Sequence, residues 1–115
     1  MMKIKINNKI IFNKIIEKKN IGKIRGLMFS TKLDKKECVL FSFNKKKRRK
    51  IHTWFVFYPI DILFLNENNI IIEKVENLKP FKRYKTNTKF EKMIECRKGI
   101  IKEKNITKKD KIQKI

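Results

Sequence analysis

Residues 61–75, DILFLNENNIIIEKV, decide the fold. Two short apolar runs, 61–65 and 70–75, flank the polar residues 66–69, three of which are Asn, a residue that turns favour. Apolar runs of this length on both sides of a polar turn predict an antiparallel β-hairpin. The hairpin indicates a chain built from short strands.

Further strands are indicated on both sides of this hairpin. Residues 38–43, CVLFSF, are apolar on both faces of a predicted strand. Residues 51–58 are the most hydrophobic stretch and predict a central strand that ends at Pro59, because proline cannot donate to a ladder. Alternation over residues 90–96 predicts another strand, and a last short one is expected near 108–112.

The N-terminal part of the chain adds a hairpin and the one expected helix. Residues 1–16 predict a hairpin around Asn7 and Asn8, and residues 21–27 predict a short helix that begins after Asn20. About eight strands and one short helix predict a mostly β protein, a small β-sandwich or jelly-roll-like barrel. We expect one domain over residues 1–115.

The charge of the chain is strongly positive. Its net charge is +21, from 32 basic and 11 acidic residues. Such a field attracts nucleic acid, anionic membrane surfaces or acidic partners. However, only 5 of the 32 basic residues are Arg, and the chain has 20 Ile and no Ala. Lys and Ile have A/T-rich codons and Ala has G/C-rich ones, so biased composition and a functional polyanion surface both stay open.

Several kinds of site are excluded by composition. One His and two Cys, 58 residues apart, cannot supply a four-ligand Cys/His zinc site. With three Gly, the chain has no dinucleotide-binding or P-loop motif, and it has no G-x-S-x-G motif. Cys38 and Cys96 lie in apolar runs and are expected to be small buried hydrophobes. No signal peptide or membrane span is indicated, so we expect a cytoplasmic protein.

Five motifs occur in a fixed order along the chain. They are RGLMF at 25–29, LFSF at 40–43, HTWFVFYPID at 52–61, LKP at 78–80 and IECRKG at 94–99. Together they resemble domain of unknown function family 192 over residues 20–112. The resemblance implies a compact β-sandwich of jelly-roll type, in a family whose activity is not established.

Two positions depart from that family pattern. The family often has Met directly after the His, whereas this chain has Thr53. It usually has Gly-Asp near the C-terminus, whereas this chain has Lys109-Asp110. Lys resists the positive φ that Gly tolerates, so this last turn is the part least expected to follow the family.

A candidate ligand-binding site is predicted from the family-matching residues Arg25, Met28, His52, Trp54 and Asp61. His52 and Trp54 are two apart on a predicted strand and face the same side, and Asp61 could turn back towards them after Pro59. A His beside a carboxylate could act as a base or hold a metal ion. The alternative is structural: His52 in the core, Asp61 in a turn, and Arg25 paired with Asp61 or Glu95.

A candidate nucleic-acid-binding segment comprises Lys45, Lys46, Lys47, Arg48, Arg49 and Lys50. Burying six cations would be prohibitive, so we expect an exposed tip between two strands. Aromatic residues follow at Trp54, Phe55 and Phe57, and rings beside cations can stack bases. Core packing is the alternative for these rings.

Three functions follow, in descending order. The first is a non-catalytic module that binds a small ligand or a protein partner. The second is an accessory protein that binds nucleic acid through its basic surface, and the third is a metal-assisted enzyme centred on His52 and Asp61. We expect a binding module rather than an enzyme, with no cofactor, a monomeric state and an anionic partner, either nucleic acid or an acidic surface.

Overall fold

The computed structural model describes residues 2–19, 32–53 and 56–115. Within these ranges the chain forms ten strands and one short helix. In chain order they are β1 Ile4–Ile6, β2 Lys9–Phe12, β3 Lys14–Lys19, β4 Glu37–Lys47, β5 Lys50–His52, β6 Ile60–Leu65, β7 Ile71–Leu78, β8 Arg83–Lys85, β9 Phe90–Arg97, α1 Ile100–Glu103 and β10 Ile112–Lys114. The prediction of a mostly β protein is confirmed. The helix expected at 21–27 lies outside the described residues.

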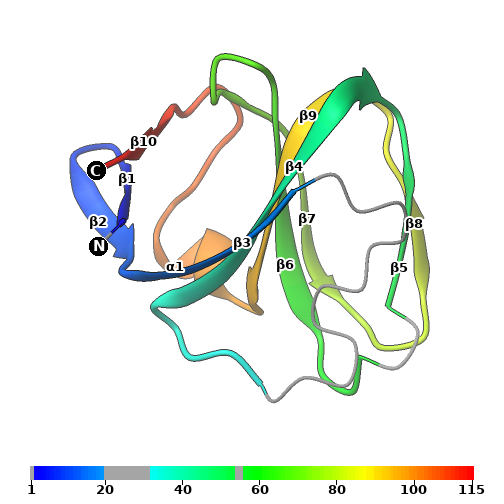
Figure 1. The fold of residues 1–115 in the computed structure, drawn as a ribbon. Coiled ribbons are helices and arrows are strands. Elements are labelled where there is room, and N and C mark those ends of the chain that lie inside the picture. Colours follow the sequence, from blue (N-terminus) through cyan, green and yellow to red (C-terminus); the bar gives the residue numbers. More distant parts are fainter. Residues whose placement is uncertain (1, 20–31, 54–55) are drawn as a thin grey trace.

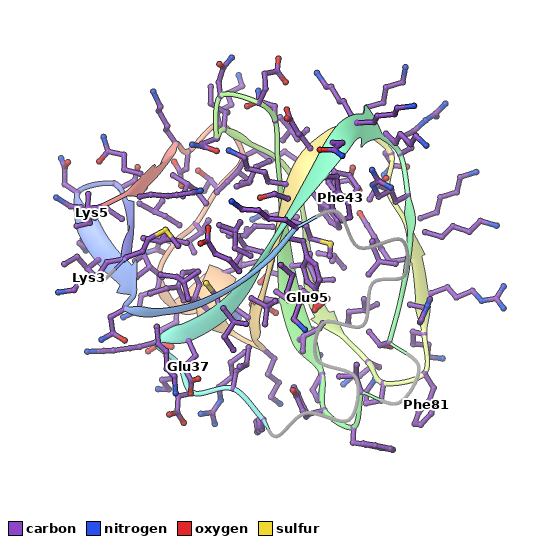
Figure 2. The ribbon with its side chains drawn as sticks, in the orientation of Figure 1. Lys3, Lys5, Glu37, Phe43, Phe81 and Glu95 are labelled. Carbon is purple, nitrogen blue, oxygen red and sulfur yellow. The ribbon has the colours of Figure 1, made fainter. Side chains whose placement is uncertain are left out.

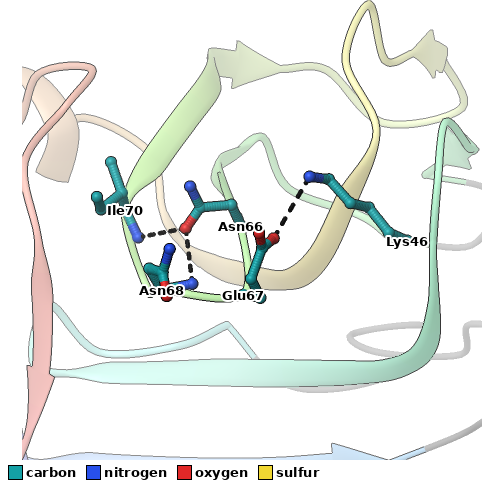
Figure 3. Close-up of polar contacts among 5 residues, drawn as sticks. All are labelled: Lys46, Asn66, Glu67, Asn68 and Ile70. Carbon is teal, nitrogen blue, oxygen red and sulfur yellow. Dashed lines mark hydrogen bonds and ion pairs between the residues drawn. The ribbon is translucent and has the colours of Figure 1, made fainter.

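The hairpin predicted from residues 61–75 is confirmed as the antiparallel pair β6–β7. Its turn is held by Asn66, whose side-chain Oδ1 accepts the backbone N–H of Asn68 at 2.9 Å and of Ile70 at 3.0 Å (Figure 3). Asn69 takes a positive φ of 61°, a conformation that Asn tolerates better than most residues. Local turn chemistry therefore fixes this hairpin.

A five-stranded sheet of order β3-β4-β9-β6-β7 runs through the middle of the molecule (Figure 1). β3 and β4 are parallel, and the other neighbours are antiparallel. The centre of the sheet is β9, so the prediction of a central strand at 51–58 is wrong. In that stretch β5 ends at His52, because the Thr53 hydroxyl donates to the Lys79 carbonyl at 2.6 Å and accepts the Lys82 N–H at 2.9 Å.

Both faces of the central sheet are buried. Leu40 of β4 and Ile94 of β9 are partners and belong to one core, whereas the next pair, Phe41 and Met93, belongs to a second core on the other face. Successive residues of a strand point to opposite faces, so a strand between two cores is buried on both sides and is apolar except where a polar side chain finds partners. All six residues of β6 are buried, and Asp61 is the one polar residue among them.

Smaller sheets cover the two faces. The sheet β10-β1-β2 and α1 lie on one side of the central sheet, and the two-stranded sheet β5-β8 lies on the other (Figure 1). Within the described ranges these sheets do not close into a barrel. At the N-terminus β1 and β2 form a hairpin, and positive φ at Asn7 and Asn8 matches a type I′ turn. Residues 14–16, expected in the same hairpin, belong instead to β3 of the central sheet. No described helix is long and apolar enough to cross a bilayer.

The last turn of the chain forms in spite of its Lys. Lys109 takes a φ of 77°, and its N–H donates to the Ile71 carbonyl at 2.8 Å. The Asp110 carboxylate accepts the Thr107 N–H at 2.8 Å and the Asn7 side-chain amide at 3.2 Å. The turn therefore keeps the left-handed backbone that a Gly would adopt more easily. The last strand, β10, begins later than the expected 108–112.

Candidate functional site

The sheet β5–β8 presents one face to solvent and one to the second core. Ile51 is buried in that core and Tyr84 packs against it. The residues on either side of them in each strand point outwards, because side chains alternate along a strand. These exposed residues, which we call the cationic ribbon, are Lys50, His52, Arg83 and Lys85. Nitrogen-tipped side chains project outward on this side of the molecule (Figure 2).

Two like charges face each other across the ribbon, because Lys50 is the direct partner of Lys85. His52 is the partner of Arg83. Like charges in directly opposite positions destabilise a strand pair. Residues 38–60 and 77–90, which supply both strands and their surroundings, contain 11 basic residues and no Asp or Glu. These two segments therefore supply no acidic side chain that could offset the positive charge of the ribbon.

The cationic segment 45–50 is exposed, as predicted, except at Arg49. The Arg49 guanidinium lies over the Phe43 ring, 4.0 Å from its centroid, and Nη2 donates to the Lys45 carbonyl at 3.0 Å. Its Nε is buried and has no hydrogen-bond partner among the described residues. Burial lowers the pKa of Arg49. Arg49 therefore anchors the β4–β5 connection, and the five other cations are exposed.

Among the described residues, Lys46 is the member of this segment that forms an ion pair. Its Nζ lies 3.4 Å from Oε2 of Glu67, in the β6–β7 turn (Figure 3). The two side chains are 48% and 53% exposed. Solvent screens a pair this exposed, so Lys46 can exchange Glu67 for another anion.

Two exposed aromatic rings meet where the ribbon ends. Phe57 is 63% exposed and Phe81 is 49% exposed, and their centroids are 5.8 Å apart in an edge-to-face arrangement. Phe81 is labelled in Figure 2. Its N–H donates to the Thr53 carbonyl at 2.9 Å, directly after β5. We call Phe57 and Phe81 the aromatic pair.

The residues of the predicted ligand site are placed as follows. His52 is exposed on β5, and Asp61 is fully buried on β6, in a different sheet. Arg25, Met28 and Trp54 lie outside the described residues. The described residues contain no group of three or more His, Cys, Asp or Glu side chains that could hold a metal ion.

Asp61 joins three elements through its carboxylate. Oδ1 accepts the Asn77 N–H of β7 at 2.8 Å, and Oδ2 accepts the Ile101 N–H of α1 at 3.0 Å. The preceding N-cap residue, Gly99, has no side chain to bond the first turn of α1. Asp61 therefore supplies, from another strand, the acceptor that a helix start requires.

Glu73 is a second buried carboxylate with its oxygens satisfied. It accepts the Tyr84 hydroxyl, the Asn87 N–H at 3.0 Å, and both the N–H and the hydroxyl of Thr88 at 3.0 and 2.7 Å. Burial alone would raise the pKa of Glu73, but these hydrogen bonds outweigh it and lower the pKa. Burial and the bond to Glu73 raise the pKa of Tyr84 to about 12. The group holds the β8–β9 connection in place.

Glu95 differs from both of these carboxylates. It lies on β9, near the middle of the molecule (Figure 2), and is 5% exposed. No hydrogen bond from the described residues reaches its carboxylate. Burial raises its pKa to about 7, and the charge of Lys18 opposes that shift only in part. Burial, and then the charge of Glu95, raise the pKa of Tyr58. Glu95 is therefore able to change its charge near neutral pH.

A shallow groove lies away from the ribbon. It has a volume of about 470 Å³ and is lined by residues that include Lys74, Glu76 and Lys102. Lys74 Nζ already donates to the Ile106 carbonyl at 3.3 Å. Charges of both signs line this groove, so it lacks the uniform charge of the ribbon.

Sequence reasoning missed part of this surface. It found Lys50 and His52, but it did not include Arg83 and Lys85, which only strand pairing brings beside them. It also missed Phe81, which follows Ile51 of β5 by 30 residues in the sequence. One partial signal was available: the two segments that pair both lack Asp and Glu, although segments 1–16 and 18–33 lack them as well.

Comparison with known proteins shows the family and the fold. A family model named DUF192 and described as "Uncharacterized ACR" matches residues 3–114. A solved structure from Sinorhizobium meliloti 1021, described as a "putative transcription regulator", has a TM-score of 0.81 at 17% identity, covering 87% of this chain and 80% of that one. A protein of unknown function from Novosphingobium aromaticivorans DSM 12444 has a TM-score of 0.85 at 18% identity, covering 97% of this chain and 82% of that one. At these identities the likeness shows the fold alone. No curated protein matches the chain.

Proposed function

This chain belongs to the DUF192 family, whose activity is not established, and from its surface we propose that it binds nucleic acid. The contacts are made by the cationic ribbon and by the exposed cations of segment 45–50. The observation that carries the proposal is the set of exposed cations that the β5–β8 pair and the adjoining segment 45–50 place on one part of the surface. Exposed cations bind phosphates by releasing the counterions around them.

Codon bias sets how many lysines the chain has, but not which of them strand pairing brings together. Acid-free stretches also occur at 1–16 and 18–33, so they do not single out this surface by themselves. The pairing of β5 with β8 does, because it places Lys50, Arg83 and Lys85 on one exposed face. Among the described lysines, Lys14 pairs with Glu37 and Lys114 with Glu17, whereas in segment 45–50 the printed ion pair is that of Lys46 with Glu67.

The backbone holds these cations in a fixed arrangement. The Arg49 N–H donates to the Thr86 hydroxyl at 2.9 Å, and the Thr86 N–H donates to the Arg49 carbonyl at 3.0 Å. Thr53 closes the other end of the ribbon through its bonds to residues 79–82. A surface with a fixed geometry loses less conformational entropy on binding than a mobile tail.

We rank this function above the ligand-binding module that the sequence favours. Asp61, one of the expected ligand-binding residues, is fully buried and uses both oxygens in bonds to backbone N–H groups. The cations of the ribbon and of segment 45–50, apart from Arg49, are exposed at the surface. The proposal includes a cytoplasmic location, which fits the free thiols of Cys38 and Cys96.

The test is a titration of labelled single-stranded RNA, single-stranded DNA and duplex DNA at several salt concentrations, followed by fluorescence anisotropy. We expect the logarithm of the association constant to fall linearly with the logarithm of salt concentration. A variant carrying K47Q, K50Q and K85Q removes three cations of the proposed interface. For a single strand its salt slope should be shallower by about 2, since each phosphate contact contributes about 0.7.

A matched variant separates this interface from net charge alone. K9Q, K104Q and K108Q also remove three exposed cations, but on β2 and around α1. This control should bind with an unchanged slope. Equal losses in the two triple variants would show that any lysine serves, and a flat slope for the unmodified protein would overturn the proposal.

A further inference from the structure

The aromatic pair adds a second kind of contact to the cationic ribbon. Seven Phe residues lie in the described ranges, and five of them are buried. The two exposed rings contact each other rather than being scattered over the surface. Exposed rings that form a pair at one place indicate a contact surface better than single exposed hydrophobes do.

The backbone presents Phe81 in a strained conformation. Its φ is 58°, in the left-handed region that bulky residues rarely occupy. The Thr53 carbonyl accepts the Phe81 N–H, and the Thr53 hydroxyl accepts the N–H of Lys82 at 2.9 Å. Thr53 itself is 1% exposed, so a buried residue holds this backbone in place. Strain of this kind persists where the surrounding structure over-determines it, commonly at binding sites.

The pair continues the line of the ribbon. Thr53 follows His52, the last residue of β5, and Phe81 precedes Arg83, the first residue of β8, by two positions. The exposed residues 79, 82 and 83 around Phe81 are all basic. Cations thus run along two strands and end at two rings.

We propose that this surface binds single-stranded nucleic acid, with a base stacked on the aromatic pair and the adjoining phosphates on the cationic ribbon. The proposal rests on the function proposed above and names its ligand class. In a duplex the base faces are stacked on each other, so rings at the protein surface cannot reach them. In a single strand they are open, and a base that stacks on an aromatic ring tightens binding about tenfold.

An anionic lipid surface is the main competing partner, since rings and cations also occur together at membrane interfaces. The arrangement favours the single strand. The cations extend in one direction from the rings along a narrow two-stranded sheet, which suits a linear polyanion, whereas a flat membrane is met best by an apolar patch with cations around it.

The test compares four probes. They are a single-stranded oligonucleotide of about 12 nucleotides, the same sugar-phosphate backbone without bases, the corresponding duplex, and vesicles of anionic phospholipid. The unmodified protein should bind the base-bearing single strand about tenfold more tightly than the abasic strand, since about 1.4 kcal/mol of stacking is a tenfold change. The double variant F57L/F81L keeps apolar side chains and removes the rings. It should lose this tenfold preference and bind the abasic strand unchanged.

The variants distinguish failure of this inference from failure of the proposed function. If F57L/F81L keeps the full preference for the base-bearing strand, or if the unmodified protein binds both strands equally, stacking is overturned while ribbon binding stands. If the protein binds anionic vesicles and no oligonucleotide, both proposals are overturned. A control variant, I10A, removes an exposed apolar residue on β2 and should change nothing. Unchanged far-UV spectra and thermal midpoints show that each variant is folded.

Discussion

Lys50 and Lys85 are direct partners across the antiparallel pair β5–β8. Both side chains are exposed, and the segments that supply the two strands contain no acidic residue. Two like charges in this position oppose the pairing that the fold requires. The pair therefore links phosphate binding to folding stability, because two adjacent cations that suit a phosphate repel each other in the free protein.

The first prediction reverses one of these charges. K85E places an opposite charge across from Lys50 and should raise the free energy of unfolding by about 0.5 kcal/mol, with a smaller gain at high salt. The same variant should weaken nucleic-acid binding. Urea denaturation at low and high salt measures the first effect. K9E, which changes the net charge equally on β2, is the control, and an equal gain in both variants would show only reduced overall repulsion.

The local parts of the fold can be predicted from the sequence, and the long-range parts cannot. The hairpin around Asn66 has its apolar runs and turn residues within 15 positions, so its pattern is complete. The stretch 51–58 is apolar, but hydrophobicity does not say that the Thr53 hydroxyl bonds the backbone of residues 79–82 and ends the strand. Residue propensities also do not show that β9 is the central strand, because its place in the sheet is decided by its pairing with β4 and β6.

The same limit applies to the candidate site. The sequence identifies cations 45–50 as exposed because six adjacent charges cannot be buried. It does not place Lys85 opposite Lys50, or Phe81 against Phe57, because those contacts come from strand pairing between distant segments. Asp61 caps α1 from 40 residues away, which no local motif signals.

The second prediction concerns Glu95 and pH. Burial raises its folded pKa to about 7 from an ordinary value of 4.5. Below pH 4.5 the group is protonated in both states. Between pH 4.5 and about 7 only the unfolded state releases its proton, so the free energy of unfolding falls. Above pH 7 the loss is complete, on the order of 3 kcal/mol.

E95Q mimics the neutral form and should remove this dependence. Relative to the unmodified protein, its free energy of unfolding should rise by about 3 kcal/mol between pH 4 and pH 8. Urea denaturation at each pH measures the difference. E91Q, on the same strand but half-buried, is the matched control. A difference that stays constant with pH would show that Glu95 ionises as freely as in the unfolded chain.

The third prediction concerns Asp61. D61N keeps one carbonyl oxygen and replaces the other with an NH₂ group, which cannot accept a hydrogen bond. One of the two backbone donors, at Asn77 or Ile101, then stays buried without an acceptor. We expect a loss of about 2–3 kcal/mol in unfolding free energy with unchanged affinity of the folded protein for nucleic acid. Weakened binding without weakened folding would instead place Asp61 in a ligand site.

The fourth prediction concerns the two thiols. Cys38 and Cys96 are fully buried, and burial raises the pKa of Cys38 to about 12 and that of Cys96 well above 9. Because the thiolate is the reactive form, neither should react with a thiol reagent at pH 8 in the folded protein. In denaturant, two equivalents of the thiol reagent should react per chain. K108C adds an exposed thiol that should react at once, and rapid reaction of the unmodified protein would contradict this burial.

The last prediction uses the strained turn at Lys109. A left-handed conformation costs a side-chain-bearing residue about 1–2 kcal/mol, and Lys109 holds a φ of 77° there. K109G removes that cost but adds about 0.4–1 kcal/mol of conformational entropy to the unfolded chain. The net expectation is a rise of roughly 0.5–1 kcal/mol in the free energy of unfolding, measured by thermal or urea denaturation.

The neighbouring residue provides the control. Lys108 is also exposed and carries the same charge, but it has no positive φ. K108G therefore gains nothing from the folded backbone and should destabilise the protein by the entropy term alone. Opposite signs in the two variants would assign the effect to the backbone at Lys109, where its N–H bonds the Ile71 carbonyl. If both variants are destabilised equally, the turn does not carry the strain inferred from its φ.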